Sequence, residues 1–101
     1  MKITAKEKRK RDKAFSKYIA VRDNHTCRRC GCTDKRMNCS HILPKEYLSL
    51  RWSSCNALLL CVNCHKFSKS SWHQSPLEAV QWLRDTLGNA YCDDLLKNKM
   101  N

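Results

Sequence analysis

Charged positions fill the start of the chain, and apolar positions at helical spacing follow them. Residues 6–13 are all charged, so this stretch has no apolar face. From Ala14 onward, apolar side chains recur three and four positions apart, which is typical of a helix with one buried side. The pattern predicts a helix over Lys6–Asp23. We expect its C-terminal half to pack on the body and its N-terminal half to project into solvent or onto a phosphate backbone. The packing positions are Ala14, Phe15, Tyr18, Ile19 and the stem of Arg22.

The middle of the chain predicts two short strands. Residues 36–42 have the composition of a strand that Pro44 ends, and residues 57–60 have that of a buried strand. Residues 46–54 between them are expected to form a loop or a short helical turn. Residues 64–71 are expected to form a short helix. No internal repeat or low-complexity linker points to a second domain.

Two helices are predicted near the C-terminus. The sequence Ser75-Pro76-Leu77-Glu78 has the form of a capping box with proline at the first helical position. Gly88 stands where a helix commonly ends, and residues 90–97 suit a last short helix. The predicted core stripe of the first of these helices is Leu77, Val80, Leu83 and Leu87.

The net charge of +11 is concentrated in the first third of the chain. Residues 1–36 hold 13 Lys and Arg against 4 Asp and Glu, a net charge of +9; the remaining residues carry +2. A basic arm on a nearly neutral body indicates a polyanionic partner, with nucleic acid first. The alternative is a solvated basic helix that only aids solubility. The residues expected to contact nucleic acid are Lys8, Arg9, Lys10, Arg11, Lys13, Arg28 and Arg29.

Eight cysteines include two C-x-x-C pairs, Cys27/Cys30 and Cys61/Cys64. Each pair lets one short turn present two thiolates to the same ion, so the four together predict a structural Zn²⁺ site. Gly31 follows the first pair, where a tight turn favours positive φ. A secreted disulfide scaffold fits less well, because the chain opens with a polar, basic stretch and contains no membrane-spanning run. We expect a reduced, cytoplasmic setting. A thiol redox protein is a weaker alternative.

Thirty residues separate the two pairs, more than the roughly 15–20 of a compact zinc ribbon. This stretch holds His41 near the end of the first predicted strand and Asn56 just before the second. His65 follows the second pair directly. Zinc is therefore expected to brace other chemistry, with His41 held opposite His65.

The segments Ser40-His41-Ile42-Leu43-Pro44, Asn56–Cys61 and Cys61-x-x-Cys64-His65 resemble the HNH endonucleases, and most closely small phage-type members such as the Rap/NinG-like recombination endonucleases. The resemblance covers residues 22–83. It implies a small α+β, zinc-stabilised domain with a ββα-metal finger. Together with the patterns above, it predicts a basic N-terminal helix or arm (residues 1–21) before an HNH domain with structural zinc and C-terminal helices (residues 22–101).

The resemblance also implies roles for individual residues. His41 is the expected general base, Asn56 orients it by a hydrogen bond and ties down the loop, and His65 binds a catalytic divalent cation (Mg²⁺, Mn²⁺ or Ni²⁺). Ser40 stands where many members carry an acidic or histidine ligand, so His73, two helical turns beyond His65, is the expected substitute. The alternatives are that His41 is structural, Asn56 an ordinary turn residue, His65 a zinc ligand and His73 a helix-terminus histidine.

The predicted function is therefore a metal-dependent DNA endonuclease, in phage DNA recombination or processing, that contacts the backbone with little base specificity. A zinc-finger DNA-binding module without catalysis is the alternative, and Ser40 favours it. No membrane partner is expected. The sequence leaves open whether the chain forms a homodimer.

Overall fold

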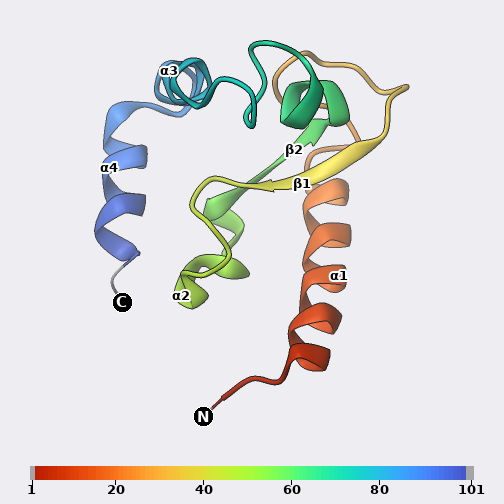
Figure 1. The fold of residues 1–101 in the computed structure, drawn as a ribbon, viewed down its shortest axis with the longest axis vertical. Helices are drawn as coiled ribbons and strands as arrows, with labels where there is room; N and C mark the ends of the chain where they lie inside the picture. The colour runs from red at the N-terminus through yellow and green to blue at the C-terminus, as the bar shows by residue number, and fades with distance from the viewer. Residues whose placement is uncertain (1, 100–101) are drawn as a thin grey trace.

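A two-stranded antiparallel sheet lies between helices on its two faces (Figure 1). The structure is a computed structural model and describes residues 2–99. None of the helices in that range is long and apolar enough to cross a membrane. The elements in chain order are α1 (Ala5–Arg22), β1 (Met37–His41), α2 (Leu48–Arg51), a 3₁₀ turn η1 (Ser54–Asn56), β2 (Ala57–Cys61), a π-helical turn η2 (Asn63–Phe67), α3 (Pro76–Leu87) and α4 (Asn89–Asn98).

Strand β2 carries the core to both sides of the sheet. All five of its residues are buried, and successive side chains of a strand point to opposite faces. Ala57 and Leu59 pack with Phe15 and Ile19 of α1. Leu58 faces the other way and packs with Leu83 of α3 and with Cys92 of α4. This alternation confirms the α+β class and explains why an uninterrupted apolar run is needed at residues 57–60.

The register of the sheet fixes which residues share an end. Met37 pairs with Cys61 at one end, and His41 pairs with Ala57 at the other. Both predicted strands are therefore present, each within one or two residues of its expected limits. The cysteine-bearing end leads into η2, and the His41 end leads into α2.

Helix α1 is present as predicted, but its N-terminal half does not simply project from the body. Thr4 caps it by accepting a hydrogen bond from the Glu7 amide at 3.1 Å. Phe15 and Ile19 are its buried residues, whereas Tyr18 is 54% exposed. In the charged half, Asp12 accepts hydrogen bonds from residues at the end of α2. The N-terminal half of α1 is therefore attached to the body, because Arg51 and Trp52 donate hydrogen bonds to the Asp12 carboxylate.

The predicted stripe and capping box of α3 are wrong in detail. Leu77 is 84% exposed and Val80 is 48% exposed, so these two members of the stripe do not pack in the core. The other two members do: Leu83 is buried against Leu58, and Leu87 packs on the same cluster, while Ala79 outside the stripe is also buried. The Ser75 side chain makes no capping bond, and its ψ of 79° differs from the extended 159° of the working cap at Thr4. Gly88 ends α3 with φ of +93°, as the sequence predicts.

The helix expected over residues 64–71 is shorter than predicted. Helical backbone ends at Phe67, because Ser68 is extended (φ −71°, ψ 157°) and its amide bonds back to the Asn63 carbonyl at 2.9 Å. The chain then makes turns up to α3. His73 therefore comes close to His65 through these turns and not through a continuous helix.

Candidate metal centre and histidine site

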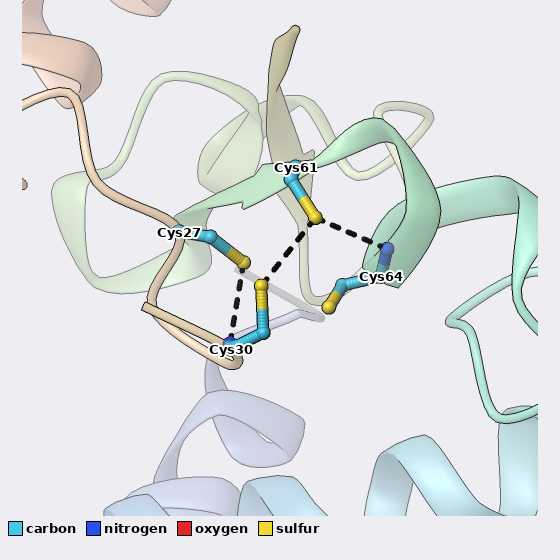
Figure 2. A group of neighbouring side chains, drawn as sticks. All are labelled: Cys27, Cys30, Cys61 and Cys64. Atoms are coloured by element: carbon cyan, nitrogen blue, oxygen red, sulfur yellow. Dashed lines mark hydrogen bonds between the residues drawn. The ribbon is translucent and has the colours of Figure 1, made fainter. Parts of the chain in front are cut away.

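Four cysteines from two distant segments converge at one end of the sheet (Figure 2). Cys27 and Cys30 lie in the loop after α1, Cys61 ends β2, and Cys64 lies in η2. Their sulfur atoms all lie within 4.8 Å of one another, and the Sγ atoms of Cys30 and Cys61 are 3.7 Å apart. A tetrahedral zinc with Zn–S bonds of about 2.3 Å separates its sulfurs by about 3.8 Å. The four thiols therefore fit a structural zinc ion.

In each C-x-x-C turn, a backbone N–H stabilises the thiolate form of the first cysteine. The Cys30 amide approaches Cys27 Sγ at 3.5 Å, and the Cys64 amide approaches Cys61 Sγ at 3.5 Å. Burial alone would raise the pKa of Cys27, but these and neighbouring N–H donors lower it from 9.0 to about 6. The pKa of Cys61 is lowered in the same way. Burial and the adjacent sulfurs raise the pKa of Cys64.

The other cysteines have different surroundings. Cys32 packs against the buried side chains of the cluster, and burial together with hydrogen bonds to Cys30 and Cys61 raises its pKa to about 12. Cys92 is buried, whereas Cys55 is exposed. Cys32 is thus the one near neighbour of the four thiols among the described cysteines outside the cluster.

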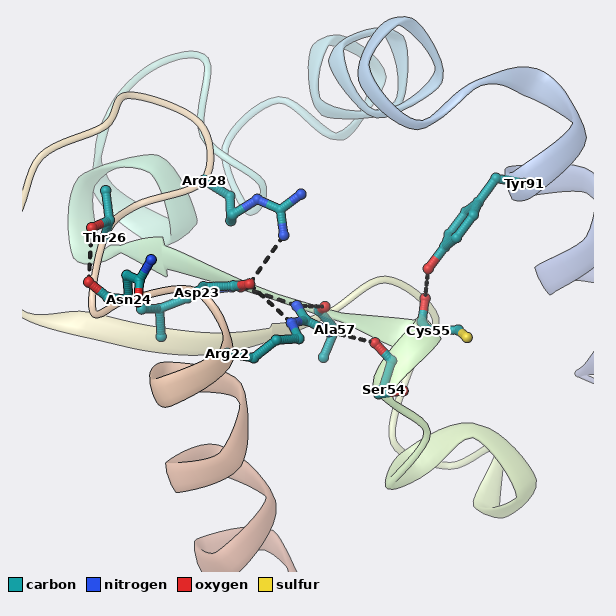
Figure 3. A network of polar contacts seen from close by, with 10 residues as sticks. Arg22, Asp23, Asn24, Thr26, Arg28, Ser54, Cys55, Ala57 and Tyr91 are labelled. Atoms are coloured by element: carbon teal, nitrogen blue, oxygen red, sulfur yellow. Dashed lines mark hydrogen bonds and ion pairs between the residues drawn. The ribbon is translucent and has the colours of Figure 1, made fainter.

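Asp23 fastens the first cysteine pair to the sheet (Figure 3). Its carboxylate accepts hydrogen bonds from Arg22 at 2.9 and 3.0 Å, from Arg28 at 3.0 Å and from the Leu59 amide at 3.0 Å. Arg22 in turn donates to the carbonyls of Ser54 and Ala57. Burial alone would raise the pKa of Asp23, but these donors outweigh it and lower the pKa. The side chain is 3% exposed, so the carboxylate is a paired, buried charge.

The structure brings His65 and His73 together. Their Nε2 atoms lie 3.2 Å apart, and the rings meet edge to face with centroids 4.5 Å apart. Two nitrogens that bind one ion at about 2.1 Å lie about 3.0–3.4 Å apart. The same distance suits an N–H···N hydrogen bond. The pairing therefore fits a shared metal ion and also an ion-free contact.

The surroundings of His65 keep its ring neutral. Burial, with repulsion from His73 and Lys66, lowers its pKa from 6.5 to about 4. A neutral imidazole is the form that binds metal. Its Nδ1 is the buried polar side-chain atom without a hydrogen-bond partner in the described part of the chain. Histidine ligands usually donate from the second nitrogen, so this site lacks that support.

His41 lies at the other end of the sheet from the cysteine cluster. It pairs with Ala57 across the sheet, and its ring contacts Phe15 of α1 with centroids 5.7 Å apart. Its Nε2 lies 2.7 Å from the Arg51 carbonyl oxygen. Burial lowers its pKa below 6.5. His65 follows the strand end at which Met37 pairs with Cys61, and its expected placement opposite His41 stays a prediction.

Asn56 holds the loop, as expected, but it does not orient His41. It is completely buried. Its Oδ1 accepts from the Leu43 amide at 2.8 Å, and its Nδ2 donates to the carbonyls of Leu43 at 3.1 Å and Leu50 at 3.2 Å. The bond to His41 comes instead from the Arg51 carbonyl. Asn56 therefore acts on His41 only through the loop that contains Arg51.

Ser40 is buried, and its hydroxyl donates to the Asn38 carbonyl at 3.4 Å. It lies one position along β1 from His41 and pairs with Leu58, on the face covered by α3. A buried hydroxyl engaged with the backbone is a poor cation ligand. The residue before His41 thus contributes no ligand in this arrangement.

The expected nucleic-acid contacts divide into two groups. Arg9, Lys10 and Lys13 are exposed on α1, and Lys8 is partly exposed beside them. Arg11, Arg28 and Arg29 have internal partners: Arg11 bonds Glu7 and lies over the Trp52 ring, Arg28 bonds Asp23, and Arg29 bonds the Ser70 carbonyl and lies over the Trp82 ring. The lysines and Arg9 of α1 therefore form the more available basic surface.

Sequence reasoning missed two acidic residues that organise this site. Asp12 and Asp23 each accept hydrogen bonds from at least two side chains. The available signal was an isolated acid inside a strongly basic segment, because such an acid often pairs with arginine. The sequence did not indicate which residues would pair with each carboxylate. Apart from Arg22, which is adjacent to Asp23, the partners lie 5 to 40 positions away along the chain.

Searches against known protein families, curated proteins and solved structures found no match.

Proposed function

We propose that this protein is a zinc-braced, metal-dependent endonuclease that hydrolyses phosphodiester bonds in DNA. The observation that carries the proposal is the bond between His41 Nε2 and the Arg51 carbonyl at 2.7 Å. A carbonyl can only accept, so Nε2 carries the proton and Nδ1 keeps a lone pair. The lowered pKa keeps the ring neutral at pH 7. A neutral histidine in a fixed tautomer is suited to remove a proton from water.

His65 and His73 are the residues that would hold the catalytic cation. A bound divalent ion would supply charge neutralisation at the phosphate and the leaving oxygen. Two imidazoles favour Ni²⁺ over Mn²⁺ and Mg²⁺, which suit oxygen ligands better. In the finer form of the proposal, β1, β2 and η2 form a ββα-metal finger braced by the zinc thiolates. The basic side chains of α1 would contact the DNA backbone, which carries no base specificity.

A zinc-braced DNA-binding module without catalysis is the second candidate. The observation that favours it is the packing of the His41 ring on Phe15 of α1, with centroids 5.7 Å apart, which suits a structural histidine. In this second function, the His41–Phe15 contact and the His65–His73 contact only stabilise the fold. Zinc would still brace the domain, and α1 would still contact the DNA backbone.

Incubation with supercoiled plasmid distinguishes the two functions. Wild-type protein, His41→Ala and His25→Asn are each tested with Mg²⁺, Mn²⁺ or Ni²⁺. His25 is the matched control because it is exposed, and asparagine tolerates its φ of +52°. Nicking by wild type and H25N, lost in H41A with zinc content unchanged, supports the endonuclease. A wild-type protein that shifts DNA but cleaves nothing with any metal leaves only the binding module.

A further inference from the structure

Asp12 connects the basic helix α1 to the end of α2. Its two carboxylate oxygens accept from Arg51 Nε at 3.0 Å and from Arg51 Nη2 at 2.7 Å, which is a two-bond fork. The Trp52 indole N–H donates to the same carboxylate at 3.0 Å, and Lys45 Nζ lies 3.9 Å away. The Arg51 bonds are the main cause that lowers the Asp12 pKa from 3.8 to about 2. The carboxylate is therefore charged at all ordinary pH values.

The residue that Asp12 grips is the one whose carbonyl accepts from His41. Arg51 is the last residue of a four-residue helix, which is too short to be rigid alone. Its side chain is 16% exposed and is fixed by Asp12, while its carbonyl lies 2.7 Å from His41 Nε2. Holding both ends of one residue sets where that carbonyl stands. The contacts thus run from Asp12 through Arg51 to the imidazole.

We propose that Asp12 is a positioning residue for His41: its grip on Arg51 holds the carbonyl that selects the Nε2-protonated tautomer. This inference rests on the proposed function only where it concerns cleavage. The state of the His41 ring is a property of the folded protein, and it is measurable without substrate. The role gives α1 a second task besides its basic surface, because the helix that would bind DNA also sets the histidine.

Three elements present charge to His41. Helix α1 contributes Asp12, which raises the His41 pKa; the loop after β1 contributes Lys45, and α2 contributes Arg51, and both lower it. Removal of the Asp12 charge leaves Lys45 and Arg51 to lower the His41 pKa without the opposing effect of Asp12. It also frees the Arg51 carbonyl, whose hydrogen bond raises the His41 pKa. Both effects have the same sign, so the pKa of His41 should fall.

The test compares Asp12→Asn with Glu7→Gln in the zinc-loaded full chain. Both variants add one unit of net charge on α1, but Glu7 bonds only exposed Arg11 by its side chain. NMR of the imidazole nitrogens, assigned by comparison with His41→Gln, reports tautomer and pKa. We expect D12N to lower the His41 pKa by about 0.5 and to mix the two tautomers, and we expect E7Q to leave both unchanged.

Plasmid cleavage provides the second measurement. D12N should lose about tenfold in kcat with KM unchanged, and the acid limb of its rate against pH should move to lower pH.

A D12N variant that keeps zinc, the wild-type tautomer and the wild-type His41 pKa overturns the inference. Arg51→Lys is the second variant, because it keeps the charge and cannot form the two-bond fork; it should mix the tautomers in the same way. If only one of the two variants folds, a wild-type tautomer and pKa of His41 in that variant also overturn the inference. If wild type cleaves no DNA, the proposed function fails, and the NMR result still decides the role of Asp12.

Discussion

His65 and His73 bring their Nε2 atoms to 3.2 Å although eight positions separate them. The sequence predicts this proximity through two turns of one continuous helix. The structure reaches it differently: η2 ends at Phe67, and the chain folds back so that the His73 amide donates to the His65 carbonyl at 3.0 Å. The Trp72 amide makes the same kind of bond to Cys64 at 2.9 Å. The pair is therefore held by backbone bonds next to the cysteine cluster.

This geometry predicts that His73→Ala weakens binding of a second metal ion. One imidazole of two is lost, so the affinity of zinc-loaded protein for Ni²⁺ should fall at least about tenfold. Isothermal titration with Ni²⁺ measures it, and His25→Asn is the control that keeps full affinity. Equal affinity in wild type and H73A would exclude His73 as a ligand and leave the 3.2 Å contact as a hydrogen bond.

Cys61→Ser should release zinc and unfold the domain. Cys61 is completely buried at the end of β2, so its loss removes one of four ligands from the strand that carries the core. A chain of 101 residues has only about 5–15 kcal/mol of stability, less than structural zinc can supply. Cys55→Ser changes an exposed cysteine outside the cluster and should keep one zinc per chain. Metal analysis and circular dichroism measure both; a folded, zinc-free C61S protein would remove the structural-zinc assignment.

Asn56→Ala should lower the free energy of unfolding by about 3 kcal/mol. The change leaves the Leu43 amide and the carbonyls of Leu43 and Leu50 without their partner in a buried place. Urea denaturation measures the loss, with Asn98→Ala at the exposed end of α4 as the control. A loss as small as that of the control would mean that water replaces the amide and that Asn56 does not hold the loop.

Local patterns in the sequence predicted the secondary structure better than the site. The apolar run at residues 57–60, Gly88 and the paired cysteines each act through near neighbours, so the strand, the helix end and the thiol cluster could be predicted. The buried face of α3 could be predicted only in part, because Leu77 and Ala79 offer similar helical stripes and only tertiary packing buries Ala79 and exposes Leu77.

The partners of His41 and Asp12 depend on how the loop before β2 folds. That loop carries Arg51, whose backbone carbonyl has no sequence signal at all. The resemblance assigned the orientation of His41 to Asn56, which is adjacent in space but bonds Leu43 and Leu50 instead. Tertiary contacts between segments about 10 to 40 positions apart decide such pairings.

Asp23 should make stability depend on pH. Its folded pKa is below the ordinary 3.8, so its contribution is fully present above about pH 4 and is lost as pH falls through the folded value. Asp23→Asn should therefore cost about 3 kcal/mol near pH 6, and the gap to wild type should shrink below pH 4. Urea denaturation across this range measures it. Asp94→Asn is the control, because it changes an exposed residue by the same charge and would lose zinc at low pH to the same extent. A similar dependence of stability on pH in D94N would contradict the prediction.

The basic surface of α1 should control the salt dependence of DNA binding. Lys10 and Lys13 are exposed on this helix, and each phosphate contact contributes about −0.9 to the log–log slope of affinity against salt on duplex DNA. The double variant Lys10→Gln/Lys13→Gln should therefore reduce the slope by about 1.8. Lys35→Gln/Lys97→Gln removes the same charge from exposed positions outside α1 and should change it little. Fluorescence anisotropy at several salt concentrations gives both slopes. Equal reductions in the two variants would mean that DNA responds to net charge and that α1 is not the contact surface.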